Sequence, residues 1–384
     1  MSTDRTEPLL REAVPSLAAR AYLDPRCHDR ELRRIWQRHW ICVGRAEEVA
    51  GARDFLRVSV ADRGVLLLRD DQGALRAYLD SCRHRGASLC TGERGRFARA
   101  AIVCPYHAWT YDLQGRLLRT GARPAPTGFD RDAHGLRPLP LRDWNGFVFV
   151  CLAPDPPPFA AGFDQPLERL DAWHLADCVA AHRTILTIAC NWKVFWENYN
   201  ECLHCPGVHP DLSRLVPIYG RGLLEAADEP ARTRQGVDGD PTAPDGLRAG
   251  ARSWTTTGEP VGPDFPGLAD ADRLAGHVYV TALPSLFVVG HVDYARAVRL
   301  RPLGPEATEL RVDYLFPRTT LAVPGFDPAP AIAFAERVLG EDAAICEANQ
   351  RGLRAAPDAR GVLMPEEYVV RSFHDWLRAE GAID

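Results

Sequence analysis

The residues best suited to chemistry form two short motifs that each pair a cysteine with a histidine. The first is Cys82-x-His84 in "SCRHRG", and the second, nineteen residues after it, is Cys104-x-x-His107 in "CPYHAW". Thiolate and imidazole groups are common ligands of zinc and iron. As a bare count, two cysteines and two histidines most often hold a tetrahedral zinc ion. The order of the ligands along the chain has to decide between the metals.

Each motif supplies one ligand of each type, and this mixture favours iron. Structural zinc sites more often take two cysteines from one motif and two histidines from another. A [2Fe–2S] centre of the Rieske kind needs the mixture, because two cysteines bind one iron and two histidines bind the other. Gly86 and Pro105 suit tight loops around a cluster, and we expect Tyr106 and Trp109 to shield it from water. The four ligands therefore predict a Rieske cluster, with zinc as the alternative.

A second candidate centre lies in "NWKVFWENYNECLHCPGVHP", residues 191–210. His204 and His209 are five residues apart, which on an undisturbed helix turns them to roughly opposite sides. Pro206 and Gly207 are expected to break the helix, so that both imidazoles reach one ion. The segment before them predicts a helix capped by Asn191 with one apolar face. That face comprises Trp192, Phe195, Trp196, Tyr199 and Leu203.

Two histidines need a third ligand, and the long helix expected near residues 328–354 offers Asp342. Val338, Leu339 and Ile345 are expected to mark the inward face of this helix, three or four residues from Asp342. An unpaired carboxylate is costly to bury, and a metal would explain it. Two histidines and one carboxylate with open positions form the facial triad of non-haem Fe(II) that activates O₂. In the alternative, Asp342 pairs with an arginine and the histidines are ordinary core residues.

Glu201 lies one helical turn before His204. A carboxylate there is placed to accept a hydrogen bond from a metal-bound imidazole and to reach a cluster histidine on its other side. The alternative is a surface glutamate. Glu197 and Asn198 are weaker candidates for the same region.

Composition bounds the class of protein. The 384 residues exceed the usual size of a single core, so two domains are expected. A net charge of −5, with scattered arginines and Lys193 as the one lysine, lacks the basic stripe of a nucleic-acid binder. No apolar run is long enough for a membrane span, and the N-terminus does not resemble a signal peptide. Eleven cysteines without an export signal predict a cytoplasmic protein whose cysteines are reduced or bound to metal.

The order of patterns along the chain predicts an α+β protein. An amphipathic helix is expected over residues 28–40, and short strands with turn signals follow to about residue 155. A proline-rich linker then leads to a strand, the capped helix, a loop over residues 236–250 and about four antiparallel strands. Two helices, near residues 328–354 and 366–380, end the chain. The predicted parts are an N-terminal helical segment 1–40 that packs on the catalytic domain, a cluster-binding domain 41–155 and a catalytic domain 156–384.

Four motifs together carry a resemblance to a known family. In chain order they are "CRHRG", "CPYHAW", "NWKVFWENYNECLHCPGVHP" and "GEDAAICEANQRGL". Over nearly its whole length the chain resembles the catalytic alpha subunit of the Rieske non-haem iron oxygenases. The resemblance implies a small all-β Rieske [2Fe–2S] module inserted before a catalytic domain with a helix-flanked, helix-grip-like antiparallel β-sheet. By the same resemblance, Cys82, His84, Cys104 and His107 bind the cluster, His204, His209 and Asp342 bind mononuclear Fe(II), and Glu201 is the bridging carboxylate.

The same resemblance implies a branch and an assembly. Glu201 and its surroundings are most similar to the oxygenases of quaternary amines, such as glycine betaine, carnitine, choline or stachydrine, whereas Leu203 departs from the tyrosine expected there. A cationic substrate favours an aromatic cage, to which Trp254, Tyr279, Phe287 and Tyr294 are candidates. In this family a head-to-tail homotrimer lets the cluster of one subunit serve the iron of its neighbour.

The implied function is hydroxylation of a C–H bond next to nitrogen with O₂, leading to N-demethylation or C–N cleavage. Electrons are expected from a separate NAD(P)H-dependent reductase with flavin and [2Fe–2S], or from a ferredoxin, because the chain lacks a G-x-G-x-x-G motif. Hydroxylation of an aromatic ring or another small molecule by the same machinery is the alternative. Two other classes stay open: a Rieske electron carrier, and a ligand-binding protein stapled by zinc.

Overall fold

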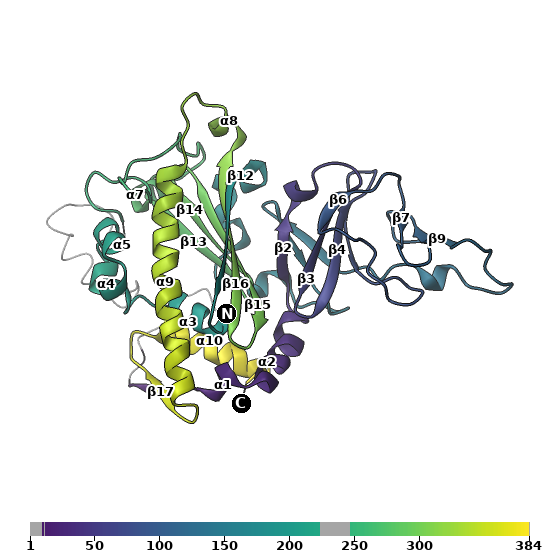
Figure 1. Cartoon of the computed structure of the whole chain (residues 1–384). Coiled ribbons are helices and arrows are strands. Elements are labelled where there is room, and N and C mark those ends of the chain that lie inside the picture. The colour runs from purple at the N-terminus through teal and green to yellow at the C-terminus, as the bar shows by residue number, and fades with distance from the viewer. Residues whose placement is uncertain (1–9, 11, 223–245, 384) are drawn as a thin grey trace. The chain divides into compact units, whose positions relative to one another are not determined.

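The computed structural model describes residues 10, 12–222 and 246–383, and the chain divides into two compact units (Figure 1). One unit comprises residues 36–159, and the other joins residues 1–35 to residues 160–384. Most of the loop expected over residues 236–250 lies outside the described residues. No helix within the described part of the chain is long and apolar enough to cross a membrane.

The unit of residues 36–159 is built from short antiparallel strands, as the sequence predicts. Its largest sheet has the order β5-β4-β3-β6, and two three-stranded sheets have the orders β10-β11-β2 and β7-β8-β9. The loops that carry the two Cys/His motifs lead into β6 and join β7 to β8. The strands are β2 (Ile41–Arg45), β3 (Asp54–Val60), β4 (Arg63–Arg69), β5 (Leu75–Leu79), β6 (Arg94–Arg96), β7 (Ile102–Val103), β8 (Trp109–Tyr111), β9 (Leu117–Thr120), β10 (Leu141–Trp144) and β11 (Phe147–Val150).

A five-stranded antiparallel sheet forms the centre of the other unit, with the order β12-β16-β15-β14-β13. The long helix α9 (Ala329–Ala355) lies over one face of this sheet (Figure 1), as expected for a helix-flanked sheet. The strands are β12 (Cys178–Ile188), β13 (His277–Ala282), β14 (Leu286–His291), β15 (Ala295–Gly304) and β16 (Ala307–Pro317), and the small sheet comprises β1 (Val14–Ala18) and β17 (Arg360–Leu363). The other helices are α1 (Arg20–Leu23), α2 (Pro25–Glu31), α3 (Trp192–Tyr199), α4 (Cys205–Val208), α5 (Pro210–Leu215), α7 (Asp270–Ala275), α8 (Arg318–Leu321) and α10 (Tyr368–Ala379).

The N-terminal helix is present but begins earlier than expected. Helix α2 starts at Pro25, whose fixed φ suits the first turn, and Asp24 caps it by accepting a hydrogen bond from the Arg26 amide. A π-helical turn, Leu32–Trp36, continues it. The expected helices at 328–354 and 366–380 correspond to α9 and α10.

Helix α3 is anchored at its N-terminus by a buried ion pair. Asn191 caps the helix, as predicted, by accepting a hydrogen bond from the amide of Lys193. The Lys193 ammonium is fully buried and lies 2.5 Å from Oε1 of Glu31, which is also fully buried. The other oxygen of Glu31 accepts a hydrogen bond of 2.7 Å from the Trp192 indole. Residues near the N-terminus therefore fix the start of the helix that leads to the candidate iron ligands.

The opposite end of α3 is held through Glu197. Its Oε1 accepts a hydrogen bond of 2.6 Å from the Tyr22 hydroxyl and lies 2.8 Å from Nε2 of His374 on α10. Glu197 thus ties α3 to both the N-terminal and the C-terminal segment. This contact set explains why it is not part of the candidate iron site, for which the sequence kept it as a weaker candidate.

Replacing Glu31 with alanine is expected to lower the free energy of unfolding by about 3–5 kcal/mol, because Lys193 would remain buried as an unpaired charge. Urea unfolding followed by tryptophan fluorescence measures the change. Asp375→Ala is the control, since it removes a carboxylate from exposed pairs with Arg371 and Arg378 and should cost at most about 1 kcal/mol. Equal effects of the two substitutions would contradict the anchoring role of Glu31.

Candidate active site

The two Cys/His motifs meet in the unit of residues 36–159. The sulfur atoms belong to buried residues, with Cys82 3% and Cys104 2% exposed, whereas His84 is exposed and His107 is partly exposed. The two imidazole rings lie 4.7 Å apart between centroids. Two inward thiols and two outward imidazoles are the arrangement that a [2Fe–2S] cluster with different ligands on its two irons requires.

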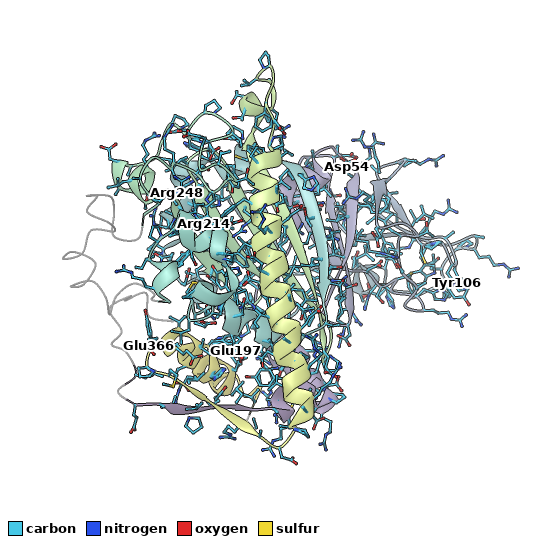
Figure 2. The ribbon with its side chains drawn as sticks, turned by 60° about the vertical axis from the view of Figure 1, so that its left-hand side comes forward. Asp54, Tyr106, Glu197, Arg214, Arg248 and Glu366 are labelled. Carbon is cyan, nitrogen blue, oxygen red and sulfur yellow. A yellow bond between two sulfur atoms is a disulfide. The ribbon has the colours of Figure 1, made fainter. Side chains whose placement is uncertain are left out.

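Side chains around these ligands restrict their positions. The Trp109 ring is buried and stacks on His84 at 4.9 Å, whereas Tyr106 is 57% exposed at the end of its unit (Figure 2). The expectation that Tyr106 and Trp109 shield the cluster from water stays a prediction. The Tyr106 ring lies 3.7 Å from that of His107. The Tyr111 hydroxyl lies 3.2 Å from the Cys82 sulfur, where it can tune the potential of a cluster by hydrogen bonding.

Glycines permit the tight loops that bring the two motifs together. Gly86 adopts φ +78°, and its amide donates to the Cys82 carbonyl at 2.9 Å, which closes the first loop. Gly121 adopts φ +92°, and a Cβ there would lie 2.5 Å from the His107 carbonyl oxygen. A larger residue at position 121 would displace the second loop.

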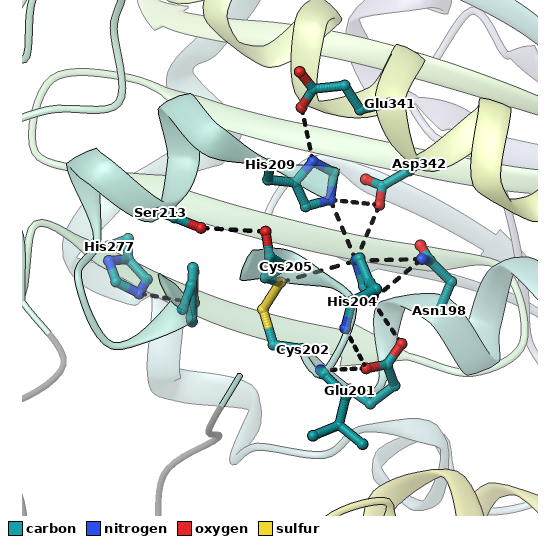
Figure 3. Close-up of a disulfide and its surroundings, with 12 residues drawn as sticks. Asn198, Glu201, Cys202, His204, Cys205, His209, Ser213, His277, Glu341 and Asp342 are labelled. Carbon is teal, nitrogen blue, oxygen red and sulfur yellow. Dashed lines mark hydrogen bonds and ion pairs between the residues drawn. A yellow bond between two sulfur atoms is a disulfide. The ribbon is translucent and has the colours of Figure 1, made fainter. Parts of the chain in front are cut away.

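The second candidate centre brings together ligands that are far apart in sequence (Figure 3). Nε2 of His209 lies 3.2 Å from Nε2 of His204 and 3.0 Å from Oδ1 of Asp342, and the remaining distance, between His204 and Asp342, is 3.5 Å. Three donors at right angles, each about 2.1 Å from one metal ion, would lie about 3.0 Å apart. The three atoms therefore fit one face of a single metal ion.

Two glutamates set the tautomers of the two imidazoles. Oε1 of Glu201 lies 2.6 Å from Nδ1 of His204, and Oε2 of Glu341 lies 2.8 Å from Nδ1 of His209 (Figure 3). A carboxylate accepts the proton on Nδ1, so that in the neutral imidazole, the form that binds a metal, Nε2 of each ring has its lone pair directed at the common point. Glu201 is thus where the sequence places it. The sequence did not predict a role for Glu341, because its neighbour Asp342 already supplied the one carboxylate expected from this helix.

The charges of the site are balanced among the same groups. Burial lowers the pKa of His204, but the hydrogen bonds and charges of Asp342 and Glu201 outweigh burial and raise this pKa to about 9. Burial raises the pKa of Asp342, and the two histidines reverse the effect and hold it below its ordinary value. The buried carboxylate is therefore anionic and has positive charge beside it, a condition that a metal cation meets.

The helix interruptions that bring His204 and His209 together lie at other residues than predicted. Helix α3 ends at Tyr199, and Pro206 occupies the first turn of the short helix α4, where proline is well tolerated. His204 immediately precedes α4, and His209 immediately follows it. The prediction that Pro206 and Gly207 break a helix is therefore wrong. The breaks lie on either side of α4, and the histidines occupy its two ends.

Two residues assigned to apolar faces lie elsewhere. Leu203 is outside α3 and 39% exposed, and Ile345 on α9 is also 39% exposed. Cys346, which is 1% exposed, occupies the inward position at that turn of α9. Val338 and Leu339 are buried as predicted. Asn198, the other weaker candidate, has its side-chain nitrogen 3.3 Å from Nε2 of His204.

A disulfide joins Cys202 to Cys205 and encloses Leu203 and His204 (Figure 3). The expectation that the cysteines are reduced or bound to metal is wrong for this pair. The Cys205 sulfur lies 3.8 Å from Nε2 of His204, but a sulfur in a disulfide is not a thiolate ligand. The disulfide instead restrains the short segment that carries His204.

The fold and the two donor sets define a class: an iron–sulfur protein with a separate three-ligand metal centre in an α+β domain. Residues 170–380 match the catalytic domain of the ring-hydroxylating alpha subunit, and residues 39–130 match the Rieske [2Fe–2S] domain. The chain therefore belongs to the family of ring-hydroxylating oxygenase alpha subunits. It is an oxidoreductase whose cofactors are a Rieske cluster and mononuclear iron, and which uses O₂, a small-molecule substrate and electrons from a separate reductase. Neither a lone electron carrier nor a zinc-stapled binding protein accounts for both domains.

Two relatives and one solved structure locate the chain within this family. The glycine betaine monooxygenase oxygenase subunit of Chromohalobacter salexigens is 32% identical over 97% of this chain and 88% of that protein. The chloroplastic choline monooxygenase of Spinacia oleracea is 27% identical over 93% of this chain and 76% of that protein. The crystal structure of the quaternary ammonium Rieske monooxygenase CntA with L-carnitine shares the fold, with a TM-score of 0.71, 21% identity and 96% of each chain covered.

Glu341→Ala is expected to weaken Fe(II) binding at the three-ligand centre by about 10–100-fold, because His209 loses the carboxylate that fixes its orientation. Anaerobic titration of iron against a chelator measures the affinity. Glu336→Ala on the same helix is the control, since Glu336 contacts Thr184 and His182 on β12 rather than the three ligands. An unchanged affinity in Glu341→Ala would show that Glu341 does not support His209.

Proposed function

We propose that this oxygenase hydroxylates an N-methyl group or another C–H bond next to nitrogen in a quaternary or methylated amine. The observation that carries the proposal is the similarity, over 97% of the chain, to a glycine betaine monooxygenase oxygenase subunit. A cluster of aromatic side chains in the same unit supports it. The Tyr199 ring lies 4.2 Å from that of Phe287 and 6.1 Å from that of Tyr279, and Trp254 lies 6.2 Å from Tyr279. Such rings stabilise a quaternary ammonium group by cation–π attraction.

Tyr294, the remaining candidate for an aromatic cage, supports the structure instead. Its hydroxyl donates a hydrogen bond of 2.8 Å to the Trp254 carbonyl, and its ring stacks on Phe316 at 5.6 Å. Tyr294 therefore fixes the backbone of Trp254, and the proposed cage comprises Tyr199, Trp254, Tyr279 and Phe287.

The ligand assignments form part of the proposal. In it, residues 41–155 form the cluster-binding domain, with Cys82, His84, Cys104 and His107 as ligands, and residues 156–384 form the catalytic domain, on which residues 1–40 pack. His204, His209 and Asp342 hold the mononuclear iron. The bound metals supply activation of O₂ with two electrons. Glu201 and Glu341 keep the proton of each imidazole on Nδ1, and in the proposed trimer an electron reaches His204 by way of Glu201.

In the proposed reaction, an N–CH₃ group, O₂, two electrons and two protons give N–CH₂OH and water. The N–CH₂OH group then releases formaldehyde and a proton and leaves a tertiary amine. The electrons come from a separate NAD(P)H-dependent reductase with flavin and [2Fe–2S], or from a ferredoxin, and the proposed compartment is the cytoplasm.

The function is tested by single turnover of the chemically reduced holoenzyme. Reduced protein is exposed to O₂ with glycine betaine, carnitine, choline or an aromatic hydrocarbon, and products are identified by mass spectrometry. We expect oxidation of a quaternary amine. Asp342→Ala should retain about two iron atoms and two sulfides per chain but form no product, because only the three-ligand centre is lost. If only the aromatic hydrocarbon were oxidised, the proposal of amine oxidation would be wrong, and ring hydroxylation would be the function.

We also propose a head-to-tail homotrimer in which a neighbouring cluster serves each iron. Chains carrying His107→Ala, which lack an intact cluster, are co-expressed with Asp342→Ala chains. Random closed rings should recover about a quarter of wild-type product per chain in single turnover, because each intact iron must neighbour an intact cluster. The same chains mixed after separate assembly are the control. Recovery no greater than that of the single variants would contradict transfer between subunits.

A further inference from the structure

The guanidinium of Arg296 is buried and makes no hydrogen bond or ion pair with any residue in the described part of the chain. The Arg296 side chain is 4% exposed, and its Nε is buried without an acceptor. Arg299, three residues later on the same strand, is also buried, but its guanidinium lies 3.0 Å from the Asp313 carboxylate. Burying a guanidinium without an anion costs several kcal/mol. Arg299 thus has a carboxylate as its structural partner, and Arg296 does not.

Strand register places Arg296 on the sheet face that the catalytic helices cover. Arg296 pairs with Val289 and Tyr314, and Val289 pairs with Tyr279, so these residues share one face. Phe287, two residues from Val289, is on the same face, and its ring contacts Tyr199 of α3.

Contacts along the same face continue to helix α9. Thr184 on β12 pairs with Val312, two residues from Tyr314, so it also faces this side. Its hydroxyl donates a hydrogen bond of 2.5 Å to Glu336 on α9. Helix α9 carries Asp342, so the Arg296 side chain points into the layer that contains the three-ligand centre.

Trp254 connects the guanidinium to the same interior. The Arg296 Cζ lies 6.0 Å from the centre of the Trp254 ring. Trp254 packs in an apolar cluster with Leu212 on α5, which begins directly after His209, and with Val338, one turn before Asp342. Helix α9, which carries Asp342, and helix α5, which begins directly after His209, therefore supply walls around Trp254.

The electrostatic surroundings of Arg296 favour an anion. Burial lowers the pKa of His291, and the charge of Arg296 lowers it further, so this fully buried imidazole is neutral. Burial raises the pKa of Tyr199, which keeps its hydroxyl protonated, and the charge of Arg296 opposes that effect. The carboxylates of Asp164, Asp293 and Glu336 act on the same tyrosines as Arg296. They accept hydrogen bonds from Thr281, Ser253 and Thr184, respectively, and none of the three forms an ion pair with the guanidinium.

We propose that Arg296 binds the carboxylate of a zwitterionic substrate, and so selects betaine-type amines over amino alcohols that share the same trimethylammonium group. This assignment rests on the proposed methylated-amine function and specifies its substrate class. A guanidinium binds a carboxylate through two parallel hydrogen bonds, which orients the ligand as well as attracting it. The rings of Tyr199, Tyr279 and Phe287 then face the cationic end.

The test compares two ligands that differ at one end, glycine betaine and choline, on the resting holoenzyme by calorimetry. Wild-type protein should bind glycine betaine more tightly than choline. Arg296→Gln should weaken glycine betaine binding by about 100-fold and leave choline binding within about threefold, because only one ligand has a carboxylate. Arg296→Lys keeps the charge but not the planar fork and should recover about tenfold. In turnover, the loss should fall on KM and leave kcat near the wild-type value.

Arg301→Gln is the matched control. Arg301 lies on the same strand, pairs with Glu309 at 2.9 Å and is 39% exposed, so its loss should change neither dissociation constant. The ligand-free melting temperature gives an independent readout. Arg296→Gln should not lower it, since the substitution removes a buried charge without a partner. A fall would assign the guanidinium to a structural contact and overturn the proposal.

The possible failures are distinguishable. Equal weakening of glycine betaine and choline by Arg296→Gln would refute the carboxylate contact while leaving the amine function in place. Tighter binding of choline than of glycine betaine by wild-type protein would also refute the carboxylate contact. This comparison does not depend on whether the variant folds. Binding of neither ligand to wild-type protein would remove the proposed function and this assignment together.

Discussion

The structure depends on one constraint: three polar atoms from distant parts of the chain must converge in an apolar interior. His204, His209 and Asp342 approach within 3.5 Å of one another, and each imidazole is oriented by a carboxylate on its other nitrogen. Such a cluster is unfavourable without a cation to satisfy it. The surrounding elements restrain the three side chains, which is the condition for a site of defined geometry.

The convergence is achieved by short helices whose ends are fixed separately. His204 and His209 occupy the two ends of α4, so a short helix sets the spacing between them. Helix α3 delivers the chain to this point, with its beginning held by Lys193 and its end by Glu197. Because these contacts come from the N-terminal segment and from α10, the terminal regions of the chain support the catalytic centre although neither contributes a candidate ligand.

Local sequence signals predicted the elements and the ligands, and tertiary contacts decided the rest. The Asn191 cap and the short strands separated by turn signals are short-range features, and the structure confirms them. The spacing of the cysteines and histidines is also a short-range feature, and the ligands that it indicates stay a prediction. Pro206 was misread because proline both ends helices and begins them, and local sequence does not separate the two cases. Periodicity alone placed Ile345 and Leu203 on helix faces. The role of Glu341 depends on its tertiary contact with His209, which local sequence does not reveal.

Buried polar groups that the fold does not need for its own stability point to both the iron site and Arg296. A folded chain pairs most of its buried polar groups, so a buried guanidinium without a carboxylate is a candidate for binding an anion. The two cases differ in what the sequence reveals. Histidines and a carboxylate form a recognisable pattern, but an arginine on a strand has no signature, since Arg299 on the same strand is an ordinary structural residue. Arg296 differs from Arg299 in the sheet face to which its strand register assigns it and in having no carboxylate partner. A buried guanidinium without a carboxylate lowers the stability of the folded protein. In the proposal, selective binding of an anionic substrate explains why the charge is retained despite this cost.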